Sequence, residues 1–319
     1  MDNLLEKYTK LNNSFKKEYI FHMGAGAGFY SEFCNMVLAI LYCLKYEYKF
    51  TMYSQDANFG YKNGWSDFFL PFCDETQANI HHLYNTRFRK PVRKRHYLKW
   101  ILYRTFNKNK YFTYELWDKY FCKEYEQELF DIPQLGIHGD LRAASTIIAK
   151  MIYRYNDKTI EEINLYKEKV NLPPQYASMQ IRRGDKTIEC KLCPTSNYFD
   201  ALKKHTDIKS LFVLTDDYNV IEEIEKEYSG WEIATLTTPD EHGYNNDAFS
   251  KTPIMEKKEK LIKLFSSIEI IRESELFIGT YTTNSGLFLG MVMPYDKVIS
   301  VQKKSWFRFD DADIKEQLV

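Results

Sequence analysis

Apolar residues follow strand-like and helix-like spacing in two separate stretches of the chain. The first stretch has a short apolar strand, a glycine-rich loop, a helix and a second strand: Tyr19–Met23, Gly24–Gly28, Ser31–Tyr46 and Tyr48–Tyr53. A strand, turn, helix and strand in succession are typical of an α/β layer. Residues 74–130 are predicted to be helical and highly charged, and a further helix is predicted over 140–155.

A second α/β rhythm begins after Pro173-Pro174, which we take as the domain boundary. Strands are predicted over 176–181, 210–214, 231–236, 276–281 and 297–301, with helices over 197–205, 220–228, 254–273 and 285–292 between them. This alternation predicts a doubly wound parallel sheet. We therefore expect two facing Rossmann-like domains of the GT-B type, 1–172 with a helical insertion and 173–319.

The composition is that of a globular enzyme, with 44% hydrophobic and 28% charged residues. Lys+Arg and Asp+Glu are both 44, which argues against a nucleic-acid partner. The six cysteines are scattered, and the pair Cys190 and Cys193 lacks the second pair that a zinc site needs. Because no secretory signal and no long apolar run is present, we expect a soluble cytoplasmic protein without a transmembrane segment.

The segment Arg182-Arg183-Gly184-Asp185-Lys186 follows the first strand of the second domain. Ligands of open α/β sheets bind at the carboxyl ends of strands. Guanidinium groups hold phosphate oxygens in pairs, and a glycine lets the backbone come close to a ligand. The segment therefore indicates a site for an anionic ligand, with a solvated charge cluster as the alternative.

Two other strand ends carry polar residues. Asp216 and Asp217 follow a strand and suit either ligand binding or the capping of the next helix. Thr282, Thr283 and Asn284 lie where a strand runs into a helix, and a helix start binds anions through its backbone N–H groups.

Three features of the first domain are less specific. Its glycine loop lacks the spacing of a dinucleotide fingerprint, but Gly26 and Gly28 suit close approach to a bound sugar or pyrophosphate. We interpret His22 and His138 as structural. The basic run Arg87–Arg95 is interpreted as a solvated face, with an acidic partner as the alternative.

The segment from Gln180 to Lys186 resembles the first motif of the α1,6-fucosyltransferase family, which includes bacterial nodulation enzymes. That motif reads His-Val-Arg-Arg-Thr-Asp-Lys and is followed by Glu, Pro and Tyr at fixed spacing. Glu189, Pro194 and Tyr198 match this spacing. Weaker matches to the family are the segments 64–71, 138–141, 215–217 and 282–284.

The resemblance implies metal-independent, inverting transfer of L-fucose from GDP-β-L-fucose to a glycan hydroxyl, with no cofactor. It implies that Arg182 contacts the pyrophosphate, that Arg183 and Asp185 support it, and that Glu189 is the general base linked by Lys186. The remaining residues expected at the nucleotide-sugar are Gly26, Gly28, Gln180, Asp216, Asp217, Glu269, Thr282, Thr283 and Asn284. Gln180 stands where the family has His, and Glu269 stands near its guanine-binding Asp. The first domain is expected to hold the acceptor.

Three alternatives stay open. The first is a transferase of the same fold that uses another GDP-sugar. The second is a catalytically inactive carbohydrate-binding protein, which would release no GDP. The third, a nicotinamide oxidoreductase, is disfavoured by the failed glycine fingerprint.

Overall fold

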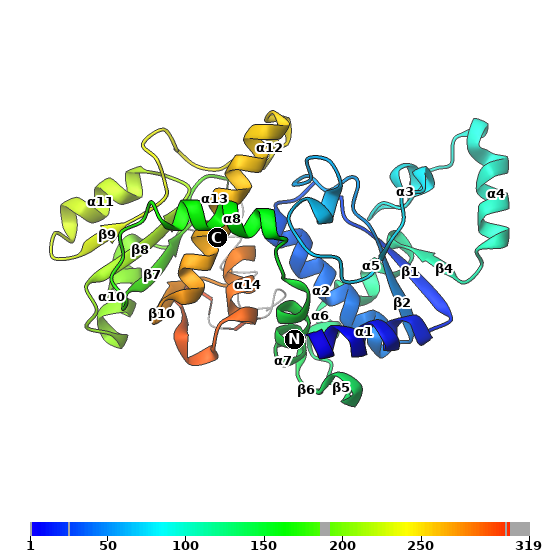
Figure 1. Ribbon diagram of the computed structural model, residues 1–319, viewed down its shortest axis with the longest axis horizontal. Helices are drawn as coiled ribbons and strands as arrows, with labels where there is room; N and C mark the ends of the chain where they lie inside the picture. Colours follow the sequence, from blue (N-terminus) through cyan, green and yellow to red (C-terminus); the bar gives the residue numbers. More distant parts are fainter. Residues whose placement is uncertain (1, 25, 186–191, 304, 307–319) are drawn as a thin grey trace. The chain divides into compact units, whose positions relative to one another are not determined.

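The computed structural model describes residues 2–24, 26–185, 192–303 and 305–306 (Figure 1). The chain forms two compact units, unit 1 (Met1–Asn156) and unit 2 (Asp157–Val319). Each contains a parallel sheet and the helices that cover it. The α/β fold class with two Rossmann-like units is therefore confirmed.

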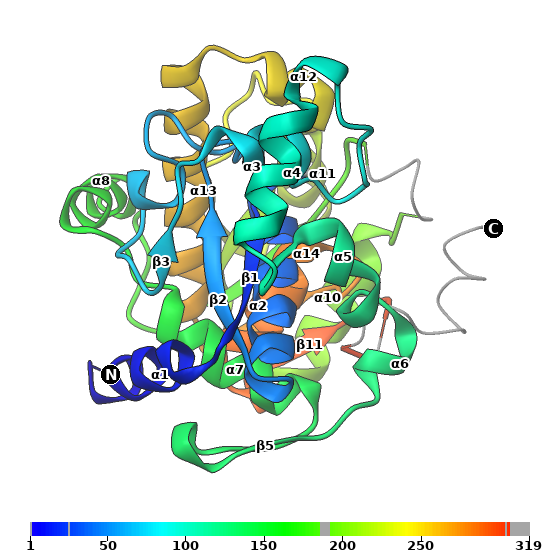
Figure 2. The ribbon, with the colours of Figure 1, turned by 90° about the vertical axis from the view of Figure 1, so that its right-hand side faces the viewer.

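The sheet of unit 1 has the strand order β3-β2-β1-β4, and all its pairings are parallel (Figure 2). Its strands are β1 (Lys17–His22), β2 (Tyr48–Tyr53), β3 (Asp74–Glu75) and β4 (Lys110–Phe112). The strand order reverses direction between β1 and β4, so the carboxyl end of β1 lies at a topological switch point.

Helix α2 (Phe29–Lys45) is the central helix of unit 1 and packs against β2 and α7. Every residue from Glu32 to Leu44 is buried, which explains why the helix carries apolar side chains on all of its faces. The rings of Phe29 and Phe69 stack with centroids 5.2 Å apart, and Trp65 stacks on Phe69 at 4.4 Å. The helix and second strand predicted here are confirmed.

The segment that resembles the family around Trp65 is part of this core. Trp65 is fully buried, and its indole Nε1 donates to the carbonyl of Leu70 at 3.0 Å. Asp67 accepts hydrogen bonds from three successive backbone N–H groups, those of residues 61–63, at 2.6–2.9 Å. These contacts fix the loop at residues 61–63, which precedes the buried Trp65, so the segment has a structural role.

The region 74–130 differs from the helical prediction because two short strands interrupt it. β3 and β4 both pair in the sheet, and β4 lies directly beside β1. In β4 only Phe112 is buried, so the strand has no alternating pattern to predict it. The helical segments here are α3 (Asn79–Tyr84), η2 (Lys94–His96), α4 (Tyr97–Phe106), α5 (Thr113–Tyr120) and α6 (Lys123–Glu126).

The rest of unit 1 comprises an N-terminal helix, two short 3₁₀ turns, a small hairpin and a final helix. Asp140 caps that final helix, accepting from the N–H of Ala143 at 2.8 Å. These elements are α1 (Asp2–Ser14), η1 (Gly64–Asp67), β5 (Phe130–Ile132), η3 (Pro133–Leu135), β6 (Ile137–Gly139) and α7 (Leu141–Ile152).

The sheet of unit 2 has the order β11-β10-β7-β8-β9 and is parallel throughout. Its strands are β7 (Ala177–Ile181), β8 (Ser210–Thr215), β9 (Glu232–Ala234), β10 (Leu276–Gly279) and β11 (Val298–Ser300). All five residues of β7 are buried, as expected for the central strand of a sheet covered on both faces. The switch point lies between β7 and β10, so the predicted doubly wound sheet is confirmed.

Helices of unit 2 connect these strands. The ring of Phe199 on α10 stacks on Tyr228 with centroids 3.6 Å apart, which closes the core on that side. The helices are α8 (Asp157–Lys167), α10 (Thr195–His205), α11 (Asn219–Glu227), α12 (Asn246–Lys251), α13 (Ile254–Glu273), α14 (Asn284–Val292) and the turn η4 (Tyr295–Lys297).

Helix α8 belongs to unit 2, whereas the sequence placed it in the first domain, before Pro173-Pro174. It packs along α13, where Lys258 donates to Glu162 at 2.5 Å. Thr159 is buried within α8, and Glu162 on the same helix serves this ion pair.

Within the part of the chain that the structure describes, none of the helices combines the length and the apolar composition needed to cross a bilayer.

Candidate functional site

The carboxyl edge of the unit 2 sheet brings together most of the polar residues that the sequence singled out. Gln180 is the fourth residue of β7, and Arg182 follows this strand at once. Asp216 follows β8, and Thr282 and Thr283 follow β10. Parallel strands end at one edge, and β7 and β10 flank the switch point where such sheets bind ligands.

Arg182 is held by two carboxylates from different loops. One guanidinium nitrogen donates to Asp185 at 2.5 Å, and the other is paired with Asp216. The guanidinium also lies over the ring of Tyr244, 4.8 Å from its centroid. A guanidinium has five N–H donors, and these two ion pairs fix its plane while leaving donors for an anion. The side chain is 20% exposed, so it is anchored and still reaches solvent.

Asp216 joins three separate backbone segments. Its carboxylate accepts from the N–H groups of Arg183 at 2.7 Å and of Tyr244 at 2.8 Å, in addition to the Arg182 side chain. Asp185 accepts from the N–H of Asn246 at 3.0 Å. The two acids therefore tie the loop after β7 to the loop at 243–246 and orient the guanidinium of Arg182.

Tyr244 contributes an apolar face to this cluster. Burial raises the pKa of its phenol to about 12, although Arg182 beside it favours the phenolate. The phenol therefore stays neutral at physiological pH, and its hydroxyl donates to Asn246 at 3.1 Å. The sequence reasoning missed Tyr244, and the neighbouring Gly243, with a φ of +96°, was the local signal of a tight loop there.

Gly184 is the position where the two loops approach most closely. Its φ is +46°, and an added Cβ would lie 2.3 Å from the carbonyl oxygen of Tyr244 and 2.6 Å from the carboxylate of Asp216. A side chain at this position therefore pushes the loops apart.

Gly184→Ala is expected to lower the free energy of unfolding by about 2–3 kcal/mol, because the backbone conformation and the lost loop contact both disfavour alanine. Urea denaturation measures this change. Gly230→Ala is the matched control, since an added Cβ there meets nothing within 4 Å. Equal stability of the two variants would show that the loop contact is dispensable.

Arg183 turns away from this cluster toward the start of α10. Its guanidinium donates to the carbonyl of Cys193 at 3.1 Å and to the hydroxyl of Thr195 at 3.1 Å. Thr195 in turn donates to Glu223 at 3.0 Å. Arg183 thus ties the end of β7 to the start of α10.

Gln180 connects β7 to the start of α14. Its side-chain nitrogen donates to the hydroxyl of Ser285 at 2.5 Å, and its oxygen accepts from Thr283 at 3.3 Å. Thr283 is the N-cap of α14 and accepts from the N–H of Gly286 at 3.0 Å. The hydroxyl of Thr282 bonds that of Thr280 at 3.1 Å, and Asn284 is the first residue of the helix. The start of α14 is therefore capped at the carboxyl edge of the sheet, where open α/β sheets bind ligands.

Other predicted residues have different surroundings. Asp217 accepts from the N–H and the side chain of Asn219 at 3.1 and 2.8 Å, which is a local turn before α11. Glu269 on α13 forms an ion pair with Arg272 at 2.8 Å. Lys186 and Glu189 lie outside the described residues.

Gly26 and Gly28 lie in unit 1, between β1 and α2. Gly28 is the N-cap of α2, and Gly26 has a φ of +74°. An added Cβ at Gly26 meets nothing within 4 Å, so its backbone is open to close approach. This loop lies at the switch point of the unit 1 sheet.

The same edge of unit 1 carries a histidine–aspartate cluster that the sequence reasoning missed. His22 ends β1, and its Nε2 lies 2.8 Å from Asp56, which follows β2. The Nδ1 of His82 lies 2.9 and 3.0 Å from the two Asp56 oxygens. His22 was interpreted as structural, and its burial agrees with that. His82, in contrast, has a 56% exposed side chain whose ring is oriented by a carboxylate.

Burial disfavours the charged form of Asp56, but the hydrogen bonds from His22 and His82 outweigh it and hold its pKa below the usual 3.8. A carboxylate whose pKa is lowered on folding stabilises the fold above its unfolded pKa, and this contribution is lost as pH falls through the folded value.

Asp56→Asn is therefore expected to cost about 1–3 kcal/mol of unfolding free energy at neutral pH, with the difference from wild type shrinking below about pH 4. Urea denaturation across this pH range tests the prediction. The control is Asp131→Asn, which removes the exposed pair with His138 and should change stability less. A pH-independent cost for Asp56→Asn would contradict a charge-based role.

Among the described residues, no group of three or more His, Cys, Asp or Glu side chains has an arrangement suited to a metal ion.

No protein-family model matches the sequence. No curated protein matches it either. Among solved structures, the chain is similar to the fucosyltransferase NodZ from Bradyrhizobium, with a TM-score of 0.53 and 11% sequence identity over 90% of this chain and 97% of that chain.

Two further crystal structures of the NodZ α-1,6-fucosyltransferase are also similar to the chain. One was co-crystallised with GDP and has a TM-score of 0.52 at 11% identity, covering 88% of this chain and 93% of that chain. The other was soaked with GDP-fucose and has a TM-score of 0.50 at 12% identity, covering 88% and 94%. The chain therefore has the fold of these fucosyltransferases, as the sequence motifs indicated.

Proposed function

We infer that the protein is a glycosyltransferase that transfers L-fucose from GDP-β-L-fucose to a glycan hydroxyl, with inversion and without a metal. The observation that carries this proposal is the doubly anchored Arg182 at the switch point of unit 2. It is a preorganised cation at the sheet edge where nucleotides bind in this class of fold. The structural similarity to fucosyltransferases supports the same sugar donor.

In this proposal Arg182 binds the pyrophosphate. When the bond between sugar and phosphate breaks, negative charge develops on the leaving GDP. A guanidinium already fixed by Asp185 and Asp216 stabilises that charge without having to reorganise. A side chain does here the work that a divalent cation does in metal-dependent transferases.

The other residues that we propose to contact the sugar donor lie at the same carboxyl edge of the unit 2 sheet. The N-terminus of α14 offers backbone N–H groups to a phosphate, and Thr282 and Asn284 lie at that end. Gln180 stands at the same edge and offers an amide to the nucleotide. We propose that Asp217 acts as a turn-forming residue, and that Glu269 contacts guanine only if its ion pair with Arg272 opens.

We propose Glu189 as the base that removes the proton from the acceptor hydroxyl, with Lys186 linking it to the phosphate. Glu189→Gln should cut turnover while leaving GDP binding intact, and unchanged turnover would exclude Glu189 as the base.

A reducing compartment is supported by the cysteines. Cys43, Cys73, Cys122 and Cys193 are all thiols in the described structure. Burial raises the pKa of the Cys43 and Cys193 thiols, so they are unreactive at neutral pH. We therefore propose that the protein works in the cytoplasm.

A panel of GDP- and UDP-sugars, with nucleotide release as the readout, tests the proposed function. Release of GDP from GDP-fucose, increased by a glycan acceptor, is the expected result. Faster turnover of another GDP-sugar would identify a transferase of the same fold with a different donor. Binding of GDP-fucose without any release would identify a carbohydrate-binding protein.

A further inference from the structure

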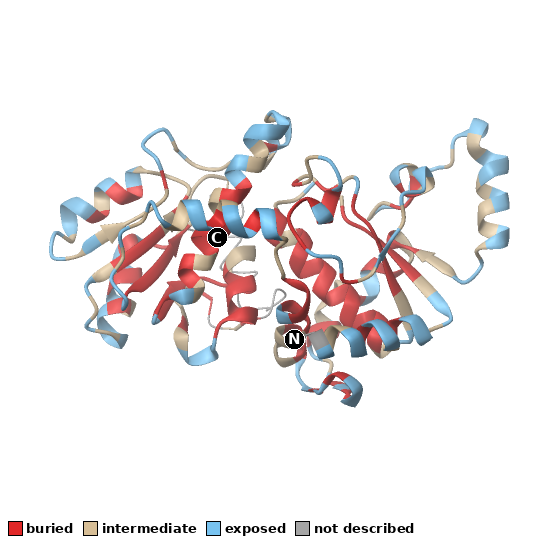
Figure 3. Cartoon of the chain, in the orientation of Figure 1, coloured by how far each residue is buried: buried red, intermediate tan, exposed pale blue. Residues whose placement is uncertain are grey.

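Helix α4 has an unusual surface, because its outward side is apolar. The exposed side chains are Leu98 at 76%, Ile101 at 43%, Leu102 at 56% and Phe106 at 82%. Their spacing of three and four residues places them along one face of the helix. No residue of α4 is buried, and Figure 3 shows the helix without red along its length. A contiguous apolar patch of this kind marks an interaction surface.

The opposite side of α4 holds the helix on unit 1. The Tyr103 hydroxyl lies 3.3 Å from Nε2 of His81, and the ring of Trp100 contacts those of Tyr84 and Phe112 with centroids 5.4 Å away. The helix is therefore anchored by its aromatic side chains, while its aliphatic side chains point outward. Figure 1 shows α4 at the outer edge of unit 1, apart from the strands of its sheet.

The sequence around this helix carries charge of a single sign. From Arg87 to Tyr114 it contains neither Asp nor Glu, but ten basic residues, whereas the whole chain has 44 of each sign. Seven of the ten are exposed: Arg89, Lys90, Arg93, Lys94, Arg95, Lys99 and Lys108. The apolar face is thus surrounded by positive charge.

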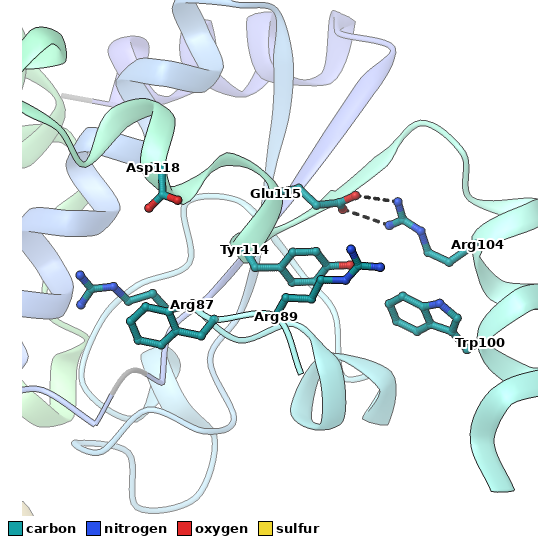
Figure 4. Close-up of a pocket in the computed structure, with 8 residues that line it drawn as sticks. Arg87, Arg89, Trp100, Arg104, Tyr114, Glu115 and Asp118 are labelled. Carbon is teal, nitrogen blue, oxygen red and sulfur yellow. Dashed lines mark hydrogen bonds and ion pairs between the residues drawn. The ribbon is translucent and has the colours of Figure 1, made fainter. Parts of the chain in front are cut away.

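A cavity of about 750 Å³ opens beside α4. Three of the ten basic residues, Arg87, Arg89 and Arg104, line it together with aromatic rings and the acids Glu115 and Asp118 (Figure 4). Arg104 is neutralised by Glu115 at 2.8 Å, while Arg89 lies over the ring of Tyr114 at 5.9 Å from its centroid. Arginines that lie against aromatic rings beside α4 can bind a phosphate or carboxylate group.

We propose that α4 and the basic segment 87–95 form a docking surface for an anionic lipid bilayer. Aliphatic side chains enter the interface between headgroups and acyl chains, while the surrounding Lys and Arg are attracted by the negative surface potential. This role replaces the solvated face expected for the basic run, since a solvated face does not explain the outward Leu98 and Leu102.

Two other partners fit these observations less well. A nucleic acid could stack on the exposed rings of Phe88, Tyr97 and Phe106, but this would leave the aliphatic Leu98, Ile101 and Leu102 in water. A second copy of the chain would bring this basic surface against itself in a symmetric dimer, and like charges would repel.

Flotation of the full chain with vesicles tests the proposal. We expect binding to phosphatidylcholine mixed with phosphatidylserine, no binding to phosphatidylcholine alone, and release by high salt. Leu98→Glu with Leu102→Glu should weaken binding more than about tenfold. Changing Arg93, Lys94 and Arg95 together to Ser should weaken it about a hundredfold, since each basic residue near such a surface contributes about fivefold.

Two matched controls separate the surface from general effects. Leu165→Glu changes a 60% exposed leucine of unit 2, and Lys7, Lys10 and Lys16 changed together to Ser remove three exposed cations of unit 1. Both should bind vesicles as wild type does. Circular dichroism checks that each variant is folded, and the exposed positions of all changed residues favour this.

The proposal is overturned if the wild-type protein does not bind anionic vesicles, or if the Leu98→Glu, Leu102→Glu variant binds them as strongly as wild type does. It is also overturned if light scattering shows a dimer that Leu98→Glu dissociates, because α4 would then be a contact between copies. Binding that the controls reduce as strongly as the α4 variants would contradict a defined surface.

Discussion

Arg182→Ala is expected to lower the rate of sugar transfer by about 10²–10³-fold, the usual effect of removing one preorganised group that stabilises developing charge. The effect should appear in kcat, because the charge on the leaving GDP is larger in the transition state than in the bound donor. Steady-state kinetics with GDP-fucose and an acceptor measures it.

Arg182→Lys should recover only part of the lost rate. A lysine ammonium is a point charge and cannot pair with Asp185 and Asp216 in the same fixed plane. Lys258→Ala is the matched control, since it removes an ion pair of similar burial with Glu162 on helix α8. A near-normal rate for Arg182→Ala would remove Arg182 from the mechanism.

Asp216→Ala is expected to cost about 3–5 kcal/mol of unfolding free energy, because it leaves a partly buried guanidinium with one carboxylate and two N–H groups without an acceptor. The side chain of Asp216 is only 14% exposed, so water replaces it poorly. GDP affinity should also fall by about tenfold, as Arg182 loses an orienting bond worth about 1.4 kcal/mol.

Asp217→Ala provides the contrast within the same loop. The carboxylate of Asp217 accepts from the N–H and the side chain of Asn219 and lies 4.0 Å from His242, so its loss affects a local turn. We expect a smaller loss of stability and unchanged GDP affinity. Urea denaturation and calorimetry on both variants make the comparison, and equal effects would contradict the separate roles of the two acids.

The sequence predicted the unit 2 sheet well because its strands are short apolar runs between clear turn signals. Ala177–Ile181 is buried along its whole length, so its end was visible in the sequence, and with it Arg182. The same holds for Asp216 after β8. A strand that is buried on both faces is a continuous apolar run in the sequence. The residues that follow the end of the strand can therefore be identified from the sequence.

The partners within the site were not predictable in the same way. Arg182 and Asp216 are 34 positions apart, and their pairing depends on two adjacent strands ending together. Tyr244 enters through a loop of unit 2 with no strand or helix pattern of its own. Such contacts arise from tertiary structure, for which a single sequence carries no local signal.

The unit 1 site was missed for a related reason. β4 has one buried residue and was included in a helical region, so the switch point beside β1 could not be located. The strands that end at His22 and before Asp56 were both predicted, but no local pattern showed that His82, from the stretch predicted as helical, joins them. Helix α4 lies in the stretch 74–130, which was predicted only to be helical and highly charged, so its outward aliphatic face was not predicted.

Calorimetric titration of the full chain with GDP, GMP and UDP, on wild type and Arg182→Ala, tests the central claim most directly. The claim is that Arg182 at the carboxyl edge of unit 2 binds the pyrophosphate of a GDP-sugar. We predict that wild type binds GDP more tightly than GMP or UDP, and that Arg182→Ala removes the advantage of GDP over GMP. Unchanged GDP affinity in Arg182→Ala, or UDP bound as tightly as GDP, would contradict it.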